Sequence, residues 1–250
     1  MSKKKAKKNP KNHFVPEAKV VEMPKSLVLG PLMNISPMTK SQEKVFQAYD
    51  KDYNLVLSGA AGSGKTFIAI ALALKQIIAE GFKRQLIIVR SVVPTRDMGF
   101  LPGSQEDKEA AYVTPYESII NELFRDSRAW KKASENGTVR FLTTSFIRGI
   151  TIKNAIVIVD ESQNCNAHEL DSIMTRIGTN ARIIFTGDYY QSDFEREKDR
   201  EGIVQFLEII DRLKYFKHVE FGWEDCVRSP LVRDYLMTKE MLAREGAKKK

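Results

Sequence analysis

The sequence predicts an α/β fold built on a mainly parallel, doubly wound sheet that is flanked by helices. Apolar runs of strand length alternate along the chain with helical patterns. Several of these runs, such as Ala155–Val159, are continuous rather than alternating, which is typical of strands covered on both faces. The chain has 250 residues, of which 42% are hydrophobic, and this is enough for one domain with a buried core.

The expected elements alternate between strand and helix. The expected strands are Asn54–Leu57, Gln85–Val89, Val139–Leu142, Ala155–Val159, Ala181–Phe185 and His218–Phe221. The expected helices are Ser41–Tyr49, Lys65–Glu80, Pro115–Lys132, Ala167–Thr175, Gly202–Leu213 and Ser229–Arg244. This alternation indicates a parallel sheet with helices on both faces.

Three segments fall outside this pattern. Residues 1–25 are lysine-rich and broken by prolines, so we expect a basic, mostly disordered arm before a single domain over residues 26–244. Residues 245–250 form a basic C-terminal tail that we expect to fray. Ser91–Tyr112, which contains two prolines and two glycines, predicts a long surface loop.

The net charge of +8 is a property of the two ends of the chain. Nine lysines lie in residues 1–12 and 248–250, and subtracting them from +8 leaves about −1 for residues 13–247. Lysine tails can bind nucleic acid through its phosphates, or they can simply keep a protein soluble. The sequence leaves these two alternatives open.

Neither a membrane anchor nor a secretory signal is expected. No apolar run approaches the length of a membrane span, and no apolar segment follows the lysine-rich start. Cys165 and Cys226 show no ligand-like spacing. They are interpreted as reduced thiols of a cytoplasmic protein.

The segment Gly59–Thr66 matches the phosphate-loop pattern G-x-x-x-x-G-K-[ST] completely. An apolar strand precedes it and a long apolar helix follows, so a chance match is a weak alternative. Glycines let backbone N–H groups surround a phosphate, and the helix start adds its positive dipole end. Lys65 is expected to reach the β- and γ-phosphates and Thr66 to bind Mg²⁺. The predicted ATP contacts are Gly59, Ala60, Ala61, Gly62, Ser63, Gly64, Lys65, Thr66 and Phe67.

A second strand, Ala155–Val159, ends in Asp160 and Glu161. Asp160 is expected to hold Mg²⁺, largely through water, and Glu161 to act as the general base for the attacking water. A charged strand end facing solvent is the alternative, and it is weaker beside a complete phosphate loop. The added glutamate argues against a small-molecule kinase, which must avoid activating water.

Further polar residues follow the ends of neighbouring strands. Gln163 follows the second strand, and Asp188 and Gln191 follow the strand Ala181–Phe185. Ligands of open α/β sheets bind beyond the carboxyl ends of the strands, so these side chains could sense the γ-phosphate or the attacking water. Ordinary turn chemistry at the Gly-Asp pair remains the alternative.

Together these residues resemble the PhoH family of P-loop ATPases from about Met38 to Leu236. The matching segments are Gly99–Gly103, Phe146–Gly149, Val159–Asn164, Gly187–Asp193 and Val227–Val232. Ser162 and Ser229 replace the usual alanine and the common histidine, and neither disturbs an assigned role. The resemblance implies ATP binding and hydrolysis and, less directly, RNA helicase or ribonuclease-associated activity. The short chain would suit a phage-encoded member in the host cytoplasm.

The same motifs are similar to the first RecA-like half of superfamily-one helicases. In that group a glutamine upstream of the phosphate loop reads adenine, and Gln42 is the matching residue. The Gly187–Gln191 element is similar to one that couples nucleotide state to a bound strand.

The chain has room for only one RecA-like half, so we expect a neighbouring copy to supply an arginine in trans. This predicts a homo-oligomer, with a hexamer implied by the resemblance. Arg228 and Arg148 are the leading candidates for a finger or a sensor, ahead of Arg196 and Arg200.

Three functions are compatible with these residues. The favoured one is an ATP-driven enzyme that acts on RNA or single-stranded nucleic acid. The alternatives are an ATP-controlled oligomeric switch, favoured by the near-neutral body, and a P-loop kinase, which Glu161 disfavours. The three histidines form no convincing catalytic pair for a nuclease.

Overall fold

The computed structural model describes residues 29–91, 105–189 and 197–248. Within them, six strands form one sheet in the order β3-β2-β4-β5-β1-β6, and every neighbouring pair is parallel. The strands are β1 (Asn54–Gly59), β2 (Gln85–Arg90), β3 (Val139–Thr143), β4 (Ala155–Asp160), β5 (Ala181–Gly187) and β6 (Phe216–Phe221). The predicted doubly wound sheet is confirmed, and each strand extends slightly beyond its predicted bounds.

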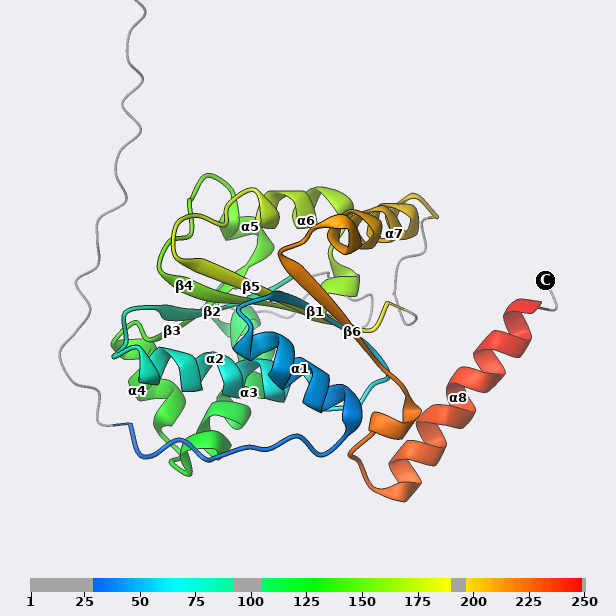
Figure 1. Cartoon of the computed structure of the whole chain (residues 1–250), viewed down its shortest axis with the longest axis horizontal. Coiled ribbons are helices and arrows are strands. Elements are labelled where there is room, and N and C mark those ends of the chain that lie inside the picture. The colour runs from blue at the N-terminus through cyan, green and yellow to red at the C-terminus, as the bar shows by residue number, and fades with distance from the viewer. Residues whose placement is uncertain (1–28, 92–104, 190–196, 249–250) are drawn as a thin grey trace, which may run out of the picture.

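Helices cover both faces of the sheet (Figure 1). One face carries α1 (Lys40–Asp50), α2 (Lys65–Ala79), α3 (Gln105–Phe124) and α4 (Ala129–Glu135). The other carries α5 (Thr144–Ile147), α6 (Ala167–Met174) and α7 (Glu197–Arg212). Alternate strand residues supply two separate cores, with Leu55 and Leu57 of β1 in one and Val56 in the other. This two-sided burial explains the continuous apolar runs in the sequence.

The helix predicted over Pro115–Lys132 is wrong, because two helices occupy that region. α3 begins at Gln105, inside the segment predicted as a loop, and contains Pro115 in its interior. It ends before Arg125, whose φ of 50° is left-handed. Asp126 then accepts hydrogen bonds from the Arg128 backbone N–H at 2.9 Å and from Lys132 Nζ at 2.6 Å, which stabilises the turn into α4.

The last two helices also differ from their predicted bounds. α7 begins at Glu197 rather than at Gly202. Gly202 instead lies where α7 meets α6, since a Cβ there would come within 2.7 Å of the Ala167 Cβ. α8 (Pro230–Lys248) continues past the predicted Arg244 and projects away from the body of the domain (Figure 1). Among the described helices, none is both long and apolar enough to cross a membrane.

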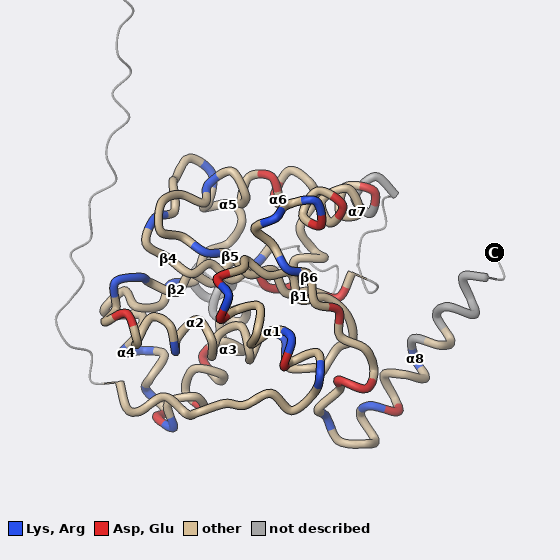
Figure 2. The backbone as a smooth tube through the Cα atoms, viewed as in Figure 1, with Lys and Arg blue, Asp and Glu red and all other residues tan. Residues whose placement is uncertain are grey.

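Several predicted features lie outside the described residues. These are the arm over residues 1–25, the segment Gly99–Gly103, Gln191 and Arg196. Where the chain is described, acidic and basic residues are interspersed along α1 rather than separated by sign (Figure 2). Cys165 and Cys226 are both free thiols.

A buried arginine joins four elements at the amino end of the parallel strands, opposite the end that leads into the phosphate loop. The Arg182 side chain, on β5, is only 5% exposed. Its guanidinium donates to the backbone carbonyls of Tyr49 and Tyr53 and to Gln76 Oε1, and lies 3.6 Å from the centre of the Tyr49 ring. It therefore links β5 to α1, to α2 and to the turn before β1.

Replacing Arg182 with alanine should lower the free energy of unfolding by about 3 kcal/mol, because buried acceptors lose their donors and the ring loses its cation. Chemical denaturation measures this loss. Arg233→Ala is the matched control, since that arginine side chain is 47% exposed on α8 and should change stability by less than about 0.5 kcal/mol. Equal losses in the two variants would contradict a structural role for Arg182.

Candidate functional site

The phosphate loop leaves the carboxyl end of β1 and leads directly into α2. Gly59, the last residue of β1, has a φ of 107°, and a Cβ on it would lie 2.1 Å from the Phe221 carbonyl oxygen. Only glycine therefore allows the loop to pass so close to β6. The Ala60 N–H donates to that same carbonyl at 3.0 Å, which holds the loop on the sheet.

Lys65 lies at the start of α2 with its ammonium group folded against the loop. Its Nζ donates to the carbonyls of Gly59 and Ala60, each at 2.8 Å. Burial lowers the pKa of Lys65, while the nearby carboxylates of Asp188 and Glu161 act to raise it. The cation is thus held beside the loop, where a phosphate would meet both it and the helix dipole.

The Asp160 carboxylate, at the end of β4, accepts hydrogen bonds from three hydroxyl groups. Thr66 and Thr186 donate to its Oδ1 at 2.7 and 2.5 Å, and Tyr116 donates to its Oδ2 at 2.8 Å. Burial raises the pKa of the Tyr116 phenol, so this group stays protonated. Tyr116 was not among the residues predicted from the sequence. No motif marks it, and only the packing of α3 on β4 brings it to Asp160.

Glu161 follows with a left-handed backbone, at a φ of 50°. Gln163 joins this glutamate to the neighbouring strand end, because its Nε2 donates to Glu161 Oε2 at 2.5 Å and its Oε1 accepts from the Asp188 N–H at 3.1 Å. The left-handed backbone of Glu161, which is not a glycine, carries strain of the kind found at functional sites. Of the three residues predicted beyond the strand ends, Gln163 and Asp188 lie together beside Glu161, whereas Gln191 lies outside the described residues.

Gln42 lies at the opposite end of the site, near the start of α1. Its Oε1 accepts from the Met38 N–H at 2.7 Å and its Nε2 donates to the Ser63 carbonyl at 3.2 Å. The side chain thus ties the segment before α1 to the phosphate loop. Asp225 supports this arrangement: burial acts to raise its pKa, but hydrogen bonds with Thr39 and Ser41 at the start of α1 lower it overall.

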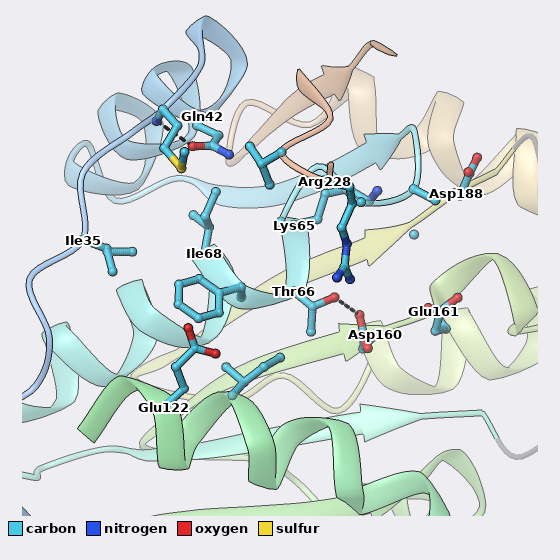
Figure 3. Close-up of a pocket in the computed structure, with 18 of the residues that line it drawn as sticks. Ile35, Gln42, Lys65, Thr66, Ile68, Glu122, Asp160, Glu161, Asp188 and Arg228 are labelled. Carbon is cyan, nitrogen blue, oxygen red and sulfur yellow. Dashed lines mark hydrogen bonds between the residues drawn. The ribbon is translucent and has the colours of Figure 1, made fainter. Parts of the chain in front are cut away.

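Arg228 comes from the segment between β6 and α8. The Val227 N–H donates to the Gly62 carbonyl at 3.1 Å, which places Arg228 over the phosphate loop of its own chain. Its side chain points into the pocket toward Thr66 and Asp160 (Figure 3). A contribution from a neighbouring copy was predicted as one role for Arg228, and this placement supports the alternative role of a sensor in cis. Arg148 is exposed after α5 and does not line the pocket.

A single cavity of about 950 Å³ brings these groups together (Figure 3). Its polar end is lined by Lys65, Thr66, Asp160, Glu161, Gln163, Asp188 and Arg228. Its more apolar end holds Ile35 and Ile68 together with Gln42 and Glu122 (Figure 3), and Met33, Met38, Phe67 and Ile119 add apolar lining. Of the predicted contacts, Gly59, Ala60 and Ser63 do not line the cavity and instead support the loop from within. The polar end suits the phosphate chain of a nucleotide, and the apolar end suits its base.

Comparisons with known proteins agree with this geometry. The family described as "PhoH-like protein" matches residues 34–239. Protein PhoH of Escherichia coli (strain K12) is 34% identical over 194 residues, which cover 77% of this chain and 54% of that protein. A PhoH-like protein of Synechocystis sp. is 29% identical over 195 residues, covering 78% and 59% of the two chains. The chain thus spans about half the length of these curated relatives.

Among solved structures, the large terminase of a thermophilic bacteriophage is similar with a TM-score of 0.47 and 14% identity. That match covers 80% of this chain and 50% of the terminase. The helicase domain of Pyrococcus furiosus Hef gives a TM-score of 0.43 at 16% identity, over 79% and 40% of the two chains.

Proposed function

Because the chain belongs to the family of PhoH-like proteins, we propose that it binds ATP in the cavity beside Gly59–Thr66 and hydrolyses it. One observation carries this proposal. The cavity is lined by a cation, a hydroxyl and two adjacent carboxylates, which are Lys65, Thr66, Asp160 and Glu161. These are the groups that phosphoryl transfer to water requires.

Binding uses the two ends of the cavity differently. The phosphates meet the N–H groups of the loop, the start of α2 and the Lys65 ammonium. The base enters the apolar end, where Gln42 retains one N–H and one lone pair beyond the bonds it already makes. Phe67 and Ile68 supply apolar surface at that end.

The residues present fit a magnesium ion. Mg²⁺ prefers oxygen ligands and keeps several waters, so one hydroxyl and one carboxylate beside the phosphates suffice. Thr66 Oγ1 and Asp160 Oδ1 lie 2.7 Å apart, and both residues line the cavity, where they would hold the ion. When bound, the ion neutralises charge on the β- and γ-phosphate oxygens.

Hydrolysis requires that a water attack the γ-phosphorus while the bond to the β-phosphate oxygen breaks. Glu161 accepts the proton of this water, and Gln163 holds the carboxylate in place through its bond to Glu161 Oε2. Lys65 and Arg228 stabilise the negative charge on the oxygens of the transferring phosphoryl group. The products are ADP and inorganic phosphate.

Arg228→Ala should lower the turnover number about a hundredfold, because it removes one positive group facing the phosphates. Arg148→Ala changes an exposed arginine outside the cavity, so it is the matched control and should leave turnover without nucleic acid near the wild-type value. Steady-state phosphate release measures both.

Mixing two inactive variants distinguishes cis from trans action of Arg228. Equal amounts of Arg228→Ala and Lys65→Ala should stay inactive together, since no subunit then holds both groups beside one nucleotide. Recovery of activity in the mixture would show that Arg228 reaches a neighbouring site.

We further propose that the protein uses ATP hydrolysis to act on RNA or single-stranded nucleic acid. We propose that it does so as a homo-oligomer, with a hexamer as the first expectation. Support for nucleic-acid binding comes from the lysines of residues 1–12 and from Phe146, which is 50% exposed and two residues before Arg148. An aromatic ring can stack on a base while an arginine contacts phosphate. The free thiols of Cys165 and Cys226 favour the cytoplasm.

ATP turnover with and without single-stranded RNA, measured together with native mass, tests these proposals. Turnover raised by RNA supports a strand-directed enzyme. Turnover that follows the oligomer mass and ignores RNA supports the alternative of an ATP-controlled switch. Absence of turnover and of nucleotide binding would refute the proposed function.

A further inference from the structure

Tyr116 is a fully buried tyrosine whose side-chain hydroxyl points at the nucleotide site. It lies on α3 with 0% exposure, and its hydroxyl donates to Asp160 Oδ2 at 2.8 Å. Buried phenols usually find a partner, and many bond a backbone carbonyl or water. Here the partner is the carboxylate that would hold Mg²⁺.

The hydrogen bonds divide between the two oxygens of that carboxylate. Thr66 and Thr186 both donate to Oδ1, whereas Tyr116 donates to Oδ2. A hydrogen bond to either oxygen resists rotation about the Cβ–Cγ bond, and the bond from Tyr116 adds a restraint on the oxygen that the two threonines do not bind. Tyr116 therefore completes the orientation of Asp160.

The phenol itself is held rigidly. Its ring centre lies 5.8 Å from that of Phe141 on β3. Arg90, at the end of β2, is a hydrogen-bonding and charged neighbour of the Tyr116 hydroxyl and also lies 5.6 Å from the centre of the Tyr112 ring. The hydroxyl thus reaches Asp160 from a position set by α3, β2 and β3 together.

We propose that Tyr116 is a positioning residue that orients the Asp160 carboxylate toward Mg²⁺, an inference that rests on the proposed ATPase function. It acts through Asp160 and touches neither the nucleotide nor the reacting atoms. Partners of this kind, which orient a metal-binding group, typically change metal affinity or activity by about 10- to 100-fold when removed.

Tyr116→Phe tests this role because it deletes one oxygen and keeps the ring that packs on Phe141. The half-saturating Mg²⁺ concentration should rise about tenfold, both for turnover and for tightening the binding of a fluorescent ADP analogue. Affinity for the same analogue in EDTA should not change. The binding titration needs no hydrolysis, so it reports on the site independently of activity.

Tyr49→Phe is the matched control. Tyr49 is also buried, at 6% exposure, and its hydroxyl donates to Gln76 Oε1 at 2.6 Å at the other end of the sheet. Both variants should lower the melting temperature slightly, but only Tyr116→Phe should shift the Mg²⁺ titration. Thr186→Val, which removes a donor from Oδ1, provides a second variant and should shift the titration in the same direction.

The outcomes separate the two levels of inference. Wild-type protein that binds no adenine nucleotide with Mg²⁺ would overturn the proposed function itself. Wild-type protein with a normal Mg²⁺ response, together with a Tyr116→Phe variant that has the same half-saturating concentration, would overturn the role of Tyr116 alone. A shift of equal size in Tyr49→Phe would also overturn it, because the effect would then follow from stability.

Discussion

Replacing Lys65 with alanine should reduce ATP turnover on the order of a thousandfold and weaken nucleotide binding. The reason is the position of the ammonium group. It lies within 2.8 Å of the Gly59 and Ala60 carbonyls and lines the polar end of the cavity, so it meets the phosphates with little rearrangement. In this partly buried site, the lost charge is poorly replaced by water.

The comparison for Lys65→Ala is Lys75→Ala, an exposed lysine on the same helix. Phosphate release and binding of a fluorescent ATP analogue should be normal in that control. Both variants should unfold at similar temperatures, because Lys65 makes its bonds to loop carbonyls rather than to the core. Wild-type turnover in Lys65→Ala would contradict the assignment of Gly59–Thr66 as the phosphate loop.

Glu161→Gln should keep ATP bound while lowering its hydrolysis by about a thousandfold. Glutamine has nearly the same shape and can still accept the hydrogen bond from Gln163, so the structure should be retained. It lacks the basic carboxylate that takes a proton from the attacking water. Rapid-quench analysis of one turnover should therefore show ATP trapped on the protein.

Glu122→Gln supplies the control for this effect. Glu122 lines the same cavity on the side of Ile35 and Ile68, away from Glu161 (Figure 3). Removing its charge should change hydrolysis by less than about threefold, since it lies away from the group that reacts. If Glu161→Gln and Glu122→Gln hydrolyse ATP equally well, another group must activate the water.

Local patterns in the sequence predicted most of the sheet and the centre of the site. All six strands were expected, because strands buried on both faces leave continuous apolar runs that need no knowledge of their neighbours. Gly59–Thr66 and the pair Asp160–Glu161 were likewise found from short segments. In each case the chemistry resides in residues that are adjacent in the chain.

The errors arose where the geometry of a turn, or the packing of a helix on the sheet, decides the local structure. The helix predicted over Pro115–Lys132 is divided because Arg125 adopts a left-handed backbone and Asp126 accepts a hydrogen bond from Lys132. α3 begins earlier than expected and contains Pro115. Propensity alone marked that proline as a helix start, although a helix that is packed on the sheet can accommodate it.

By itself, the sequence determined the parallel sheet, the phosphate loop and the carboxylates at the end of β4, since strand periodicity and short motifs depend only on near neighbours. Tertiary structure alone decided that Arg228 lies over the loop of its own chain and that Tyr116 reaches Asp160. Arg228 comes 166 positions after Gly62 in the chain, and Tyr116 comes 44 positions before Asp160. Only the packing of β6 beside β1, and of α3 against the sheet, brings them to the site.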